Sequence, residues 1–427
     1  MAAEFIPHKS EASAKDIGDS NLIPEGWRQL TLSEIAASKI VYGIVQAGPH
    51  VPEGVPYLKS SDIGGKIDVS NLQKTAPEVH ARYRRSTVRP GDIVISLRGN
   101  TGETSIVPPS LHEANLTQGT ARIAVAAEFD SDFIYHQIAS SAVQRRIHSA
   151  TKGSTFVEIT LDDLRNVEML CPSSRCEQRR IAEIVSTWDR AIETVEALVT
   201  NARGQKKALM QSLLTGKKRL PGFSEEWRHR RIGELSTKID RRNDGARVPV
   251  LTISSTSGFV RQDQKYSRFM AGKSVESYIM LRRGEFAYNK GNSKTYEFGC
   301  VFDLEEFECG LVPHVYVCFK LKDGYSHRFY KALFEADYLA PQLGRLVNTG
   351  IRNNGLLNIT PAQFLSTSVP VPPLDEQDAI AALMETASAE LRALAGQLAA
   401  LRKEKSALMQ QLLTGKRRVK ADQKEAA

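Results

Sequence analysis

The sequence has no long apolar run. None of its apolar stretches reaches the ~20 residues that a helix needs to cross a bilayer. The first residues, MAAEFIPHKS, lack the apolar segment of a signal peptide. We therefore expect a flexible N-terminal tail over residues 1–21, a cytoplasmic location and no membrane partner.

Cysteine is also scarce. The five cysteines are odd in number, and no two of them have CxxC spacing. Cys300, Cys309 and Cys318 recur at even intervals around His314, which is compatible with a zinc site. They lie in apolar runs such as VYVCFKL, where a small buried thiol is ordinary. We favour buried thiols and expect no metal site.

The motifs of common catalytic sites are missing. There is no GxxxxGK[ST], HExxH or GxSxG, no PPY-type tetrapeptide, and no PD dipeptide before D/E-x-K. DEQD at 375–378 resembles a helicase acidic box, but its place at a predicted helix start favours compensation of the helix dipole. These absences argue against an enzyme such as a nuclease or methyltransferase.

Positive charge is in excess. The 427 residues include 57 Lys and Arg against 49 Asp and Glu, a formal charge of +8 with pI about 9.1. This balance favours an anionic partner such as nucleic acid, although a generic basic surface would give the same numbers. The length exceeds that of one ordinary core and predicts two or three domains.

The chain repeats itself. Residues 208–219, ALMQSLLTGKKR, and 407–418, ALMQQLLTGKRR, agree at ten of twelve positions. The match extends back without a gap, so that 177–216 corresponds to 376–415 at an offset of 199. Just upstream, STFVEITLDDL (154–164) resembles NGLLNITPAQF (354–364). Two units of one plan are therefore predicted.

A third repeated segment occupies a different position relative to the other two. LIPEGWRQLTLSEIA (22–36) resembles LPGFSEEWRHRRIGELS (220–236), which follows the first LLTGKKR directly. Nothing similar follows LLTGKRR at the C-terminus. The repeat is thus circular, and it predicts a pseudo-twofold molecule whose two ends meet in space.

Residues 177–216 and 376–415 have the 3-4 apolar spacing of a coiled-coil seam. Two such seams pair most simply with each other, as antiparallel helices about 60 Å long at 1.5 Å per residue. Amphipathic helices that pack on their own domains would show the same spacing. Lys206 and Lys405 interrupt the seams at matching positions, where a polar residue sets register. The seam positions, also candidates for partner docking, are Ile192, Val195, Val199, Leu209, Leu213, Leu391, Leu394, Leu398, Leu401, Leu408 and Leu412.

The helix ends have recognisable signals. Ser174 and Glu177 fit a capping box, Asp375 is a candidate cap of the second helix, and Gly216 and Gly415 suit left-handed C-caps. The basic clusters beyond the glycines, 217–219 and 416–418, fit helix ends better than DNA contacts.

The remaining regions mix short strands with helices, which we expect at 131–149 and 326–347. The predicted fold is α+β, with two mixed α/β domains joined by the two long helices. The predicted segments are a tail (1–21), a domain (22–176), a helix (177–216), a domain (217–375), a helix (376–415) and a basic tail (416–427).

Candidate ligand contacts lie in polar, glycine-bearing loops. SLRGNTGETS (96–105) and YNKGNSKTYEFG (288–299) both place a basic residue before Gly-Asn. Glycine lets the backbone approach a phosphate, while Arg and Asn have the donor patterns that read base edges. Polar strand loops are also common without any ligand. The candidate DNA contacts are Lys59, Ser60, Arg82, Arg84, Arg98, Gly99, Asn100, Lys152, Ser154, Lys290, Asn292, Lys294, Tyr296, Arg352, Asn353 and Asn354.

The order of these motifs resembles the specificity (S) subunit of type I restriction–modification systems. The series runs from P-E-G-W through GD-strand-RG, a K-G loop before I-T, a proline stretch and EQ, to a helix ending in LLTGK, and a variant of it follows. Gly284-Glu285 replaces Gly-Asp in the second copy, and the loop there lacks the second glycine of 99–102. The resemblance covers nearly the whole chain.

The resemblance implies two target recognition domains, each reading half of an asymmetric, bipartite site in double-stranded DNA, with the helices as spacer. It also implies two methyltransferase (M) subunits docked on those helices and restriction (R) motor-nuclease subunits. S-adenosylmethionine, ATP and Mg would belong to these partners, and this chain would hold no cofactor. The alternative is a coiled-coil scaffold without sequence-specific DNA reading.

Overall fold

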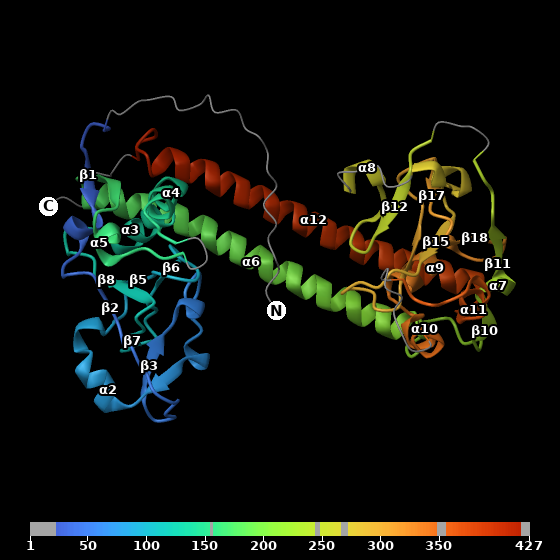
Figure 1. The fold of residues 1–427 in the computed structure, drawn as a ribbon, viewed down its shortest axis with the longest axis horizontal. Coiled ribbons are helices and arrows are strands. Elements are labelled where there is room, and N and C mark those ends of the chain that lie inside the picture. The colour runs from blue at the N-terminus through green and yellow to red at the C-terminus, as the bar shows by residue number, and fades with distance from the viewer. Residues whose placement is uncertain (1–22, 154–156, 244–247, 266–271, 348–355, 420–427) are drawn as a thin grey trace. The chain divides into compact units, whose positions relative to one another are not determined.

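The protein is described by a computed structural model that covers residues 23–153, 157–243, 248–265, 272–347 and 356–419. The chain divides into two units, residues 1–194 with 398–427 and residues 195–397 (Figure 1). The division cuts each long helix, so that each unit contains the start of one helix and the end of the other. The predicted mixture of two α/β domains and two long helices is confirmed.

A four-stranded antiparallel sheet forms the centre of the first unit. Its order is β2 (Val41–Tyr42), β8 (Thr120–Ile123), β5 (Ile93–Ser96) and β6 (Thr104–Ile106). A smaller sheet, in the order β4 (Gln73–Thr75), β3 (Val55–Leu58) and β7 (Asn115–Leu116), has its own small core around Leu58, Val88 and Leu116. The pair β1 (Trp27–Thr31) and β9 (Glu168–Pro172) joins the two ends of the domain.

The second unit repeats the central four-stranded sheet and also has a strand pair equivalent to β1 and β9. The order is β11 (Ser236–Ile239), β18 (Val317–Leu321), β15 (Phe286–Asn289) and β16 (Cys300–Asp303), and β10 (Arg228–Arg231) pairs with β19 (Ser368–Val371). Its additional pieces are different: β12 (Leu251–Ser254) with β13 (Gly258–Arg261), and β14 (Ile279–Arg282) with β17 (Cys309–Val312). The two units thus share a frame but not the parts attached to it.

Each helix predicted inside the domains is broken in two. Residues 131–149 form α3 (Ser131–Ile138) and α4 (Ser141–Ser149), because the Ser140 side chain caps a new helix by accepting from the Val143 N–H. The range 326–347 contains α9 (His327–Glu335) and α10 (Ala340–Leu346), separated by Asp337 in the left-handed region at φ 54°. Short helices complete the domains: α1 (Leu32–Ile35), α2 (Pro77–Arg82), α5 (Leu161–Arg165), α7 (Ile232–Leu235), α8 (Gln262–Lys265) and α11 (Pro361–Leu365).

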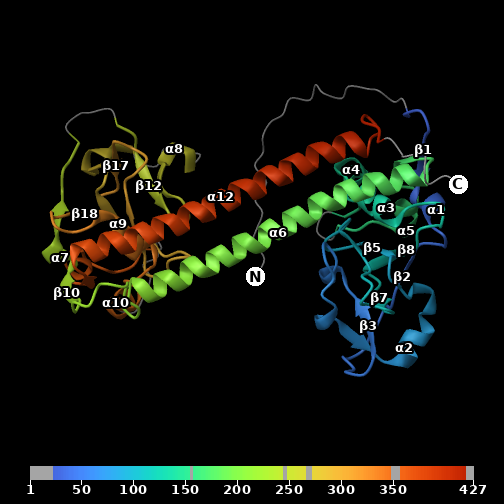
Figure 2. The same ribbon diagram turned by 180° about the vertical axis from the view of Figure 1, so that it is seen from behind.

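The long helices are α6 (Arg175–Leu213) and α12 (Leu374–Leu412). In each unit the start of one lies beside the end of the other (Figures 1 and 2). Ile181 and Val185 share a core with Leu412 and Leu413 in the first unit, and Leu213 shares one with Ile380 and Met384 in the second. All eleven predicted seam positions are buried or half-buried. Within each unit, the seam is therefore an antiparallel helix contact that also packs on the domain.

The helix ends largely follow the sequence signals. The Glu177 N–H donates to the Ser174 hydroxyl, and Gly216 and Gly415 have φ of 71° and 70°, as a left-handed C-cap requires. Two details differ. The Glu177 carboxylate does not complete the capping box but binds Arg418. Asp375 lies inside the first turn rather than before it, because α12 begins at Leu374.

Candidate nucleic-acid interface

A buried acidic residue supports the loop that contains Arg98. The Asp92 carboxylate accepts from the Arg89 N–H at 2.8 Å and pairs with Arg122 at 2.8 Å. The chain then enters β5, and the hydroxyl of Ser96 at the end of this strand donates to the Arg98 carbonyl at 2.9 Å. The Gly-Asp motif is therefore structural: it fixes the start of the strand that presents the loop.

Four of the predicted contacts, Lys59, Ser60, Arg98 and Gly99, line one hollow of about 760 Å³. The hollow is open to solvent on the first unit, and its other walls come from segments far away in sequence. These are Ile44, Val45, Ser61, Thr117, Gln118, Gly119, Val157 and Glu158. Cationic, hydroxyl and amide groups converge on this concave surface. Such groups can contact the phosphates of a nucleic acid and form hydrogen bonds to the edges of its bases.

Glycines permit the close packing of this hollow. A Cβ at position 119 would lie 3.0 Å from the Ser60 Oγ and 3.2 Å from the Arg98 Nε, so the bare backbone allows the arginine to lie across it. Gly99 has φ of 77° and nothing within 4 Å of its missing Cβ. Its exposed, left-handed backbone is accessible to a ligand, while Asn100 is exposed beside it but outside the hollow.

Arg82, the last residue of α2, and Arg84, in the turn that follows, are exposed and lie elsewhere. This turn is held by Asn115, which is fully buried at the start of β7. The Asn115 amide donates to the Tyr83 carbonyl at 3.3 Å, and its oxygen accepts from the Ser86 hydroxyl at 2.7 Å. A fixed basic turn is suited to phosphate contact, but it lies apart from the residues around Arg98.

Lys152 also lies outside the hollow. Its ammonium pairs with Asp163 at 2.8 Å, and its backbone pairs with Glu158, which also bridges to Arg98. Lys152 therefore supports the segment that carries the wall residues Val157 and Glu158. Ser154 lies outside the described residues.

The second unit supports its loop in the same way. The Glu285 carboxylate accepts from the Arg282 N–H at 2.7 Å and pairs with Arg241 at 3.1 Å. Replacement of Gly-Asp by Gly284-Glu285 therefore preserves the support.

The loop after β15 differs in conformation. Gly291 is not left-handed, and its N–H donates to the Asn289 side chain at 3.0 Å. Lys290 is half-buried, whereas Asn292 and Lys294 are exposed. Arg352, Asn353 and Asn354 lie outside the described residues.

The prediction that Tyr296 contacts DNA is wrong. Its ring is 9% exposed and packs edge to face on Phe302, and its hydroxyl donates to the Glu335 carbonyl at 3.4 Å. Desolvation by burial raises its pKa to about 12. The residue serves the core of the second unit and not a DNA-facing surface, because the loop folds back toward α9.

Sequence reasoning missed the walls of the hollow in the first unit. Ile44, Gln118 and Val157 are separated by many residues, and only the sheet brings them together: the Gln118 N–H donates to the Ile44 carbonyl at 2.9 Å. The available local signal was Gln118-Gly119, a polar and glycine pair between two strands. Nothing local identified Ile44 or Val157.

The starts and ends of the long helices are clamped by equivalent ion pairs. In the second unit, Arg219 donates to both oxygens of Glu376, at 2.6 and 2.7 Å, and the Trp227 indole N–H donates to the same carboxylate at 2.8 Å. In the first unit, Arg418 donates to Glu177 at 2.7 and 2.8 Å. Arg418 also donates to the Glu25 carbonyl, and Trp27 lies against Gly415. The first and last described segments of the chain therefore meet in the first unit, in agreement with the circular repeat.

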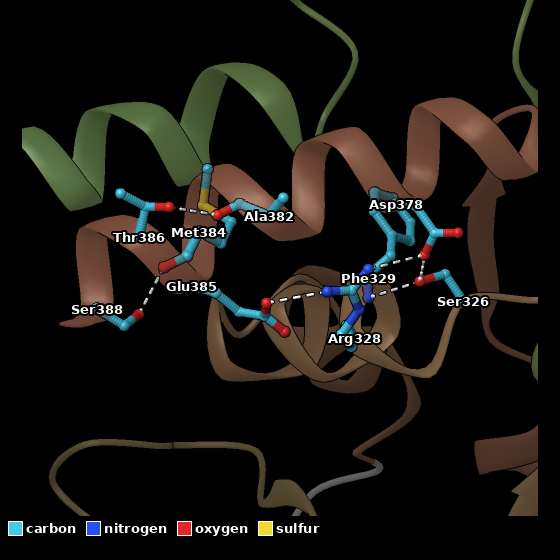
Figure 3. A network of polar contacts seen from close by, with 9 residues as sticks. All are labelled: Ser326, Arg328, Phe329, Asp378, Ala382, Met384, Glu385, Thr386 and Ser388. Carbon is cyan, nitrogen blue, oxygen red and sulfur yellow. Dashed lines mark hydrogen bonds and ion pairs between the residues drawn. The ribbon is translucent and has the colours of Figure 1, made fainter.

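The adjoining glutamines tie each helix start to its domain. Gln178 accepts from the Asp130 N–H and donates to the Pro172 carbonyl, while Gln377 accepts from the Ser326 N–H and donates to the Pro372 carbonyl. Figure 3 shows further contacts in the second unit. Ser326 donates to Asp378 at 2.6 Å, and Arg328 reaches Asp378 and Glu385 on α12. The EQ motif thus holds each helix on its domain.

The seam lysine of the first unit belongs to a charged cluster. Lys405 on α12 pairs with Asp189 on α6, whose carboxylate lies 3.9 Å from the Nδ1 of His136 on α3. His136 is 3% exposed, and its other ring nitrogen lies 3.0 Å from the Ser186 hydroxyl. Desolvation lowers the pKa of His136 from 6.5 to about 4, with Lys405 acting in the same direction and Asp189 and Asp130 opposing.

Stability of the first unit is therefore expected to fall with acid. Because the folded pKa of His136 is lowered, its contribution is complete above the unfolded pKa of 6.5 and is lost as pH falls toward about 4. The loss reaches up to about 3 kcal/mol. Urea unfolding of the wild type and of His136→Gln, from about pH 7.5 to pH 4.5, checks this. The glutamine retains a polar group toward Ser186 without titrating and should flatten the profile; parallel profiles would contradict the assignment.

Three of the five thiols are buried and unreactive. Burial raises the pKa of Cys171, Cys300 and Cys318 to about 12, so they stay protonated. All five cysteines are free. Within the described part of the chain, no three His, Cys, Asp or Glu side chains gather as a metal site would require. Nor does any helix there combine the length and apolar character needed to cross a membrane.

Comparison with known proteins finds a family model that matches part of the chain. Residues 24–200 match the type I restriction modification DNA specificity domain. The specificity subunit of the type I restriction enzyme EcoBI from Escherichia coli is 29% identical over 215 residues. That alignment covers 49% of this chain and 44% of the relative, so it spans less than half of the relative's length.

Solved structures share the fold along most of the chain. The S subunit of a type I restriction–modification system from M. genitalium aligns with a TM-score of 0.57 and 15% identity, covering 92% of this chain and 97% of the other. A chain from a type I R-M system, solved to explain complex assembly and conformational transition, aligns with a TM-score of 0.56, 18% identity, and coverage of 92% and 99%. At these identities the likeness concerns the fold.

Proposed function

We propose that the chain is a type I restriction–modification specificity subunit, the non-catalytic, DNA-reading member of such a complex. The observation that carries the proposal is the hollow around Arg98. It lies within the segment that matches a DNA specificity domain, and it gathers cationic, hydroxyl and amide groups. Such groups contact phosphates and the edges of guanine and adenine.

In this proposal each unit reads one half of a bipartite, asymmetric site. The proposal is supported by the fact that the two units share a central sheet but differ in the elements attached to it. The central sheets have the same strand order, whereas the smaller sheets and the loops after β5 and β15 differ. A common frame with different contact surfaces suits two different half-sequences. Because phosphate contacts dominate affinity, DNA binding should weaken strongly with salt.

The remaining components follow from the same proposal. The long helices set the spacing between half-sites and dock two methyltransferase subunits, to which restriction subunits add. S-adenosylmethionine, ATP and Mg²⁺ would bind to those partner subunits. The catalytic motifs missing from this sequence would lie in the partner subunits as well. The helix clamps described above give the spacer defined ends.

Exchange of residues 37–150 for the corresponding region of a relative with a different target tests the proposal. The exchange should change one half of the methylated sequence and leave the other half intact, because β11–β18–β15–β16 and its loops are untouched. Mapping methylated bases in a host that expresses the complex provides the measurement. Methylation that changes in both halves would refute separate reading, and methylation indifferent to the exchange would favour the scaffold alternative.

A further inference from the structure

Sequence identity between the two long helices is concentrated at their ends. Between 179–205 and 378–404 only 4 of 27 positions agree, whereas ten of twelve agree between 208–219 and 407–418. The helix middles have therefore diverged while the ends have not. A requirement common to both ends has preserved them.

Internal packing explains only part of this identity. Leu213 and Leu412 are core residues, the glycines form the C-caps, and Arg219 and Arg418 form the clamps. The pairs Ala208 with Ala407 and Gln211 with Gln410 are exposed in both copies. The seam varies between the copies, as buried Val199 and half-buried Leu398 show. Exposed side chains that stay identical against this background indicate a contact outside the unit.

The preserved residues line an equivalent groove in each unit. In the first unit, Met409, Gln410 and Leu413 face the junction of α3 and α4 across a groove of about 540 Å³. In the second unit, Met210 and Gln211, with Leu214, face the junction of α9 and α10 across about 620 Å³. We call these the end grooves. Each exists because the domain helix is broken at that point, by Ser140 in one unit and at Asp337 in the other.

The shared part of the two grooves defines what fits both. The floor is apolar, formed by Met and Leu, which disfavours a phosphate backbone and favours an apolar side chain. Exposed cations flank it: Arg402 and Lys416 line the first groove, and Arg203 and Lys217 are exposed at the matching sequence positions of the second unit. The domain walls differ, with Arg145 and Arg146 in one groove and Glu335 and Asp337 in the other. An apolar anchor with acidic flanks complements the common features.

We propose that both end grooves dock the same segment, an apolar anchor with acidic flanks, from two copies of one partner protein. Two equivalent grooves on one chain match a partner present twice, which under the proposed function is the methyltransferase subunit. The inference rests on that function and adds the place of attachment. It assigns the repeated ALMQ-LLTGK motif to partner binding in addition to helix capping.

Site-specific photo-crosslinking tests the assignment. A photoreactive residue at Gln211 or Gln410, in the full chain mixed with the methyltransferase subunit, should crosslink to one and the same partner peptide. Gln205 and Glu404 are matched controls: they are equivalent, exposed and about 120° around the helix from the groove positions. They should give little crosslinking to that peptide. Crosslinks within this chain, to DNA, or to different partner peptides from the two sites would overturn the proposal.

Stoichiometry provides a second readout. Gln211→Arg and Gln410→Arg each extend a long side chain over one groove from an exposed position, so the fold should persist, as helicity by circular dichroism verifies. Each should weaken one partner site at least tenfold and reduce a two-partner complex to a one-partner complex by mass. The double variant should lose both, and Gln205→Arg with Glu404→Arg should retain both. If the wild type binds no methyltransferase subunit, the proposed function fails; if it binds two and the variants do too, only the groove assignment fails.

Discussion

Glu376→Ala is expected to destabilise the second unit by about 3 kcal/mol, the cost of breaking a buried, hydrogen-bonded ion pair. The Glu376 side chain is 0% exposed and accepts two bonds from Arg219 and one from Trp227. Its removal leaves the indole N–H without an acceptor and the guanidinium without its counterion. Arg219 is 25% exposed and can partly rehydrate, which keeps the loss at the lower end of the range for such pairs.

The first unit contains the matched control. Glu177→Ala removes the equivalent carboxylate, but its partner Arg418 is 47% exposed, and the Trp27 indole N–H has no hydrogen-bond partner within the described structure. Less is lost there, about 1 kcal/mol, because the cation is already well hydrated. Hydrogen exchange of amides in α7 and α1 reports on the two units separately. Equal losses, or a larger loss in Glu177→Ala, would show that burial and the tryptophan bond do not govern the clamp.

The long helices around this clamp could be predicted from the sequence, but the partners of the clamp residues could not. The periodic seam and the duplicated ending predicted both long helices to within three residues, because these signals are local and repeated. The sequence also predicted a capping box between Ser174 and Glu177. Only one half of it forms, the bond from the Glu177 N–H to the Ser174 hydroxyl. The side chain binds Arg418, 241 residues away, because a charge-assisted pair outweighs a cap to a neutral backbone N–H. No local pattern signals such a partner.

The candidate interface divides in the same way. Arg98 and Gly99 were predicted because a basic residue and glycine follow a strand, and Lys59 and Ser60 lie with them. Tyr296 was misplaced because it lies in the same polar, glycine-bearing stretch (288–299) as the other candidates, whereas its hydroxyl meets the end of α9 and its ring fills the core. The helix breaks near Ser140 and at Asp337 were missed because apolar periodicity continues through both. They became visible only with backbone angles and caps.

Inserting seven residues into both long helices, after Thr194 in α6 and after Gln397 in α12, is expected to change the spacing of the recognised half-sites. These positions are the borders between the two units, so each unit keeps all its own residues. A heptad preserves the phase of the seam to ~20° and adds about 10 Å at 1.5 Å per residue. At 3.4 Å per base pair this corresponds to about three base pairs.

The expected result is a preference for a spacer about three base pairs longer, with both half-sequences unchanged. Three base pairs also turn the duplex by ~100°, whereas the heptad turns the helices by only ~20°, so the best site should be bound at least tenfold more weakly than the wild type binds its own. Competition binding of the assembled complex to sites that differ only in spacer length measures this. A heptad inserted into α6 alone is the control, since it offsets one seam against the other and should prevent assembly. If the double insertion kept the original spacer at full affinity, the helices would not set the distance, and spacing would have to arise from the partner subunits.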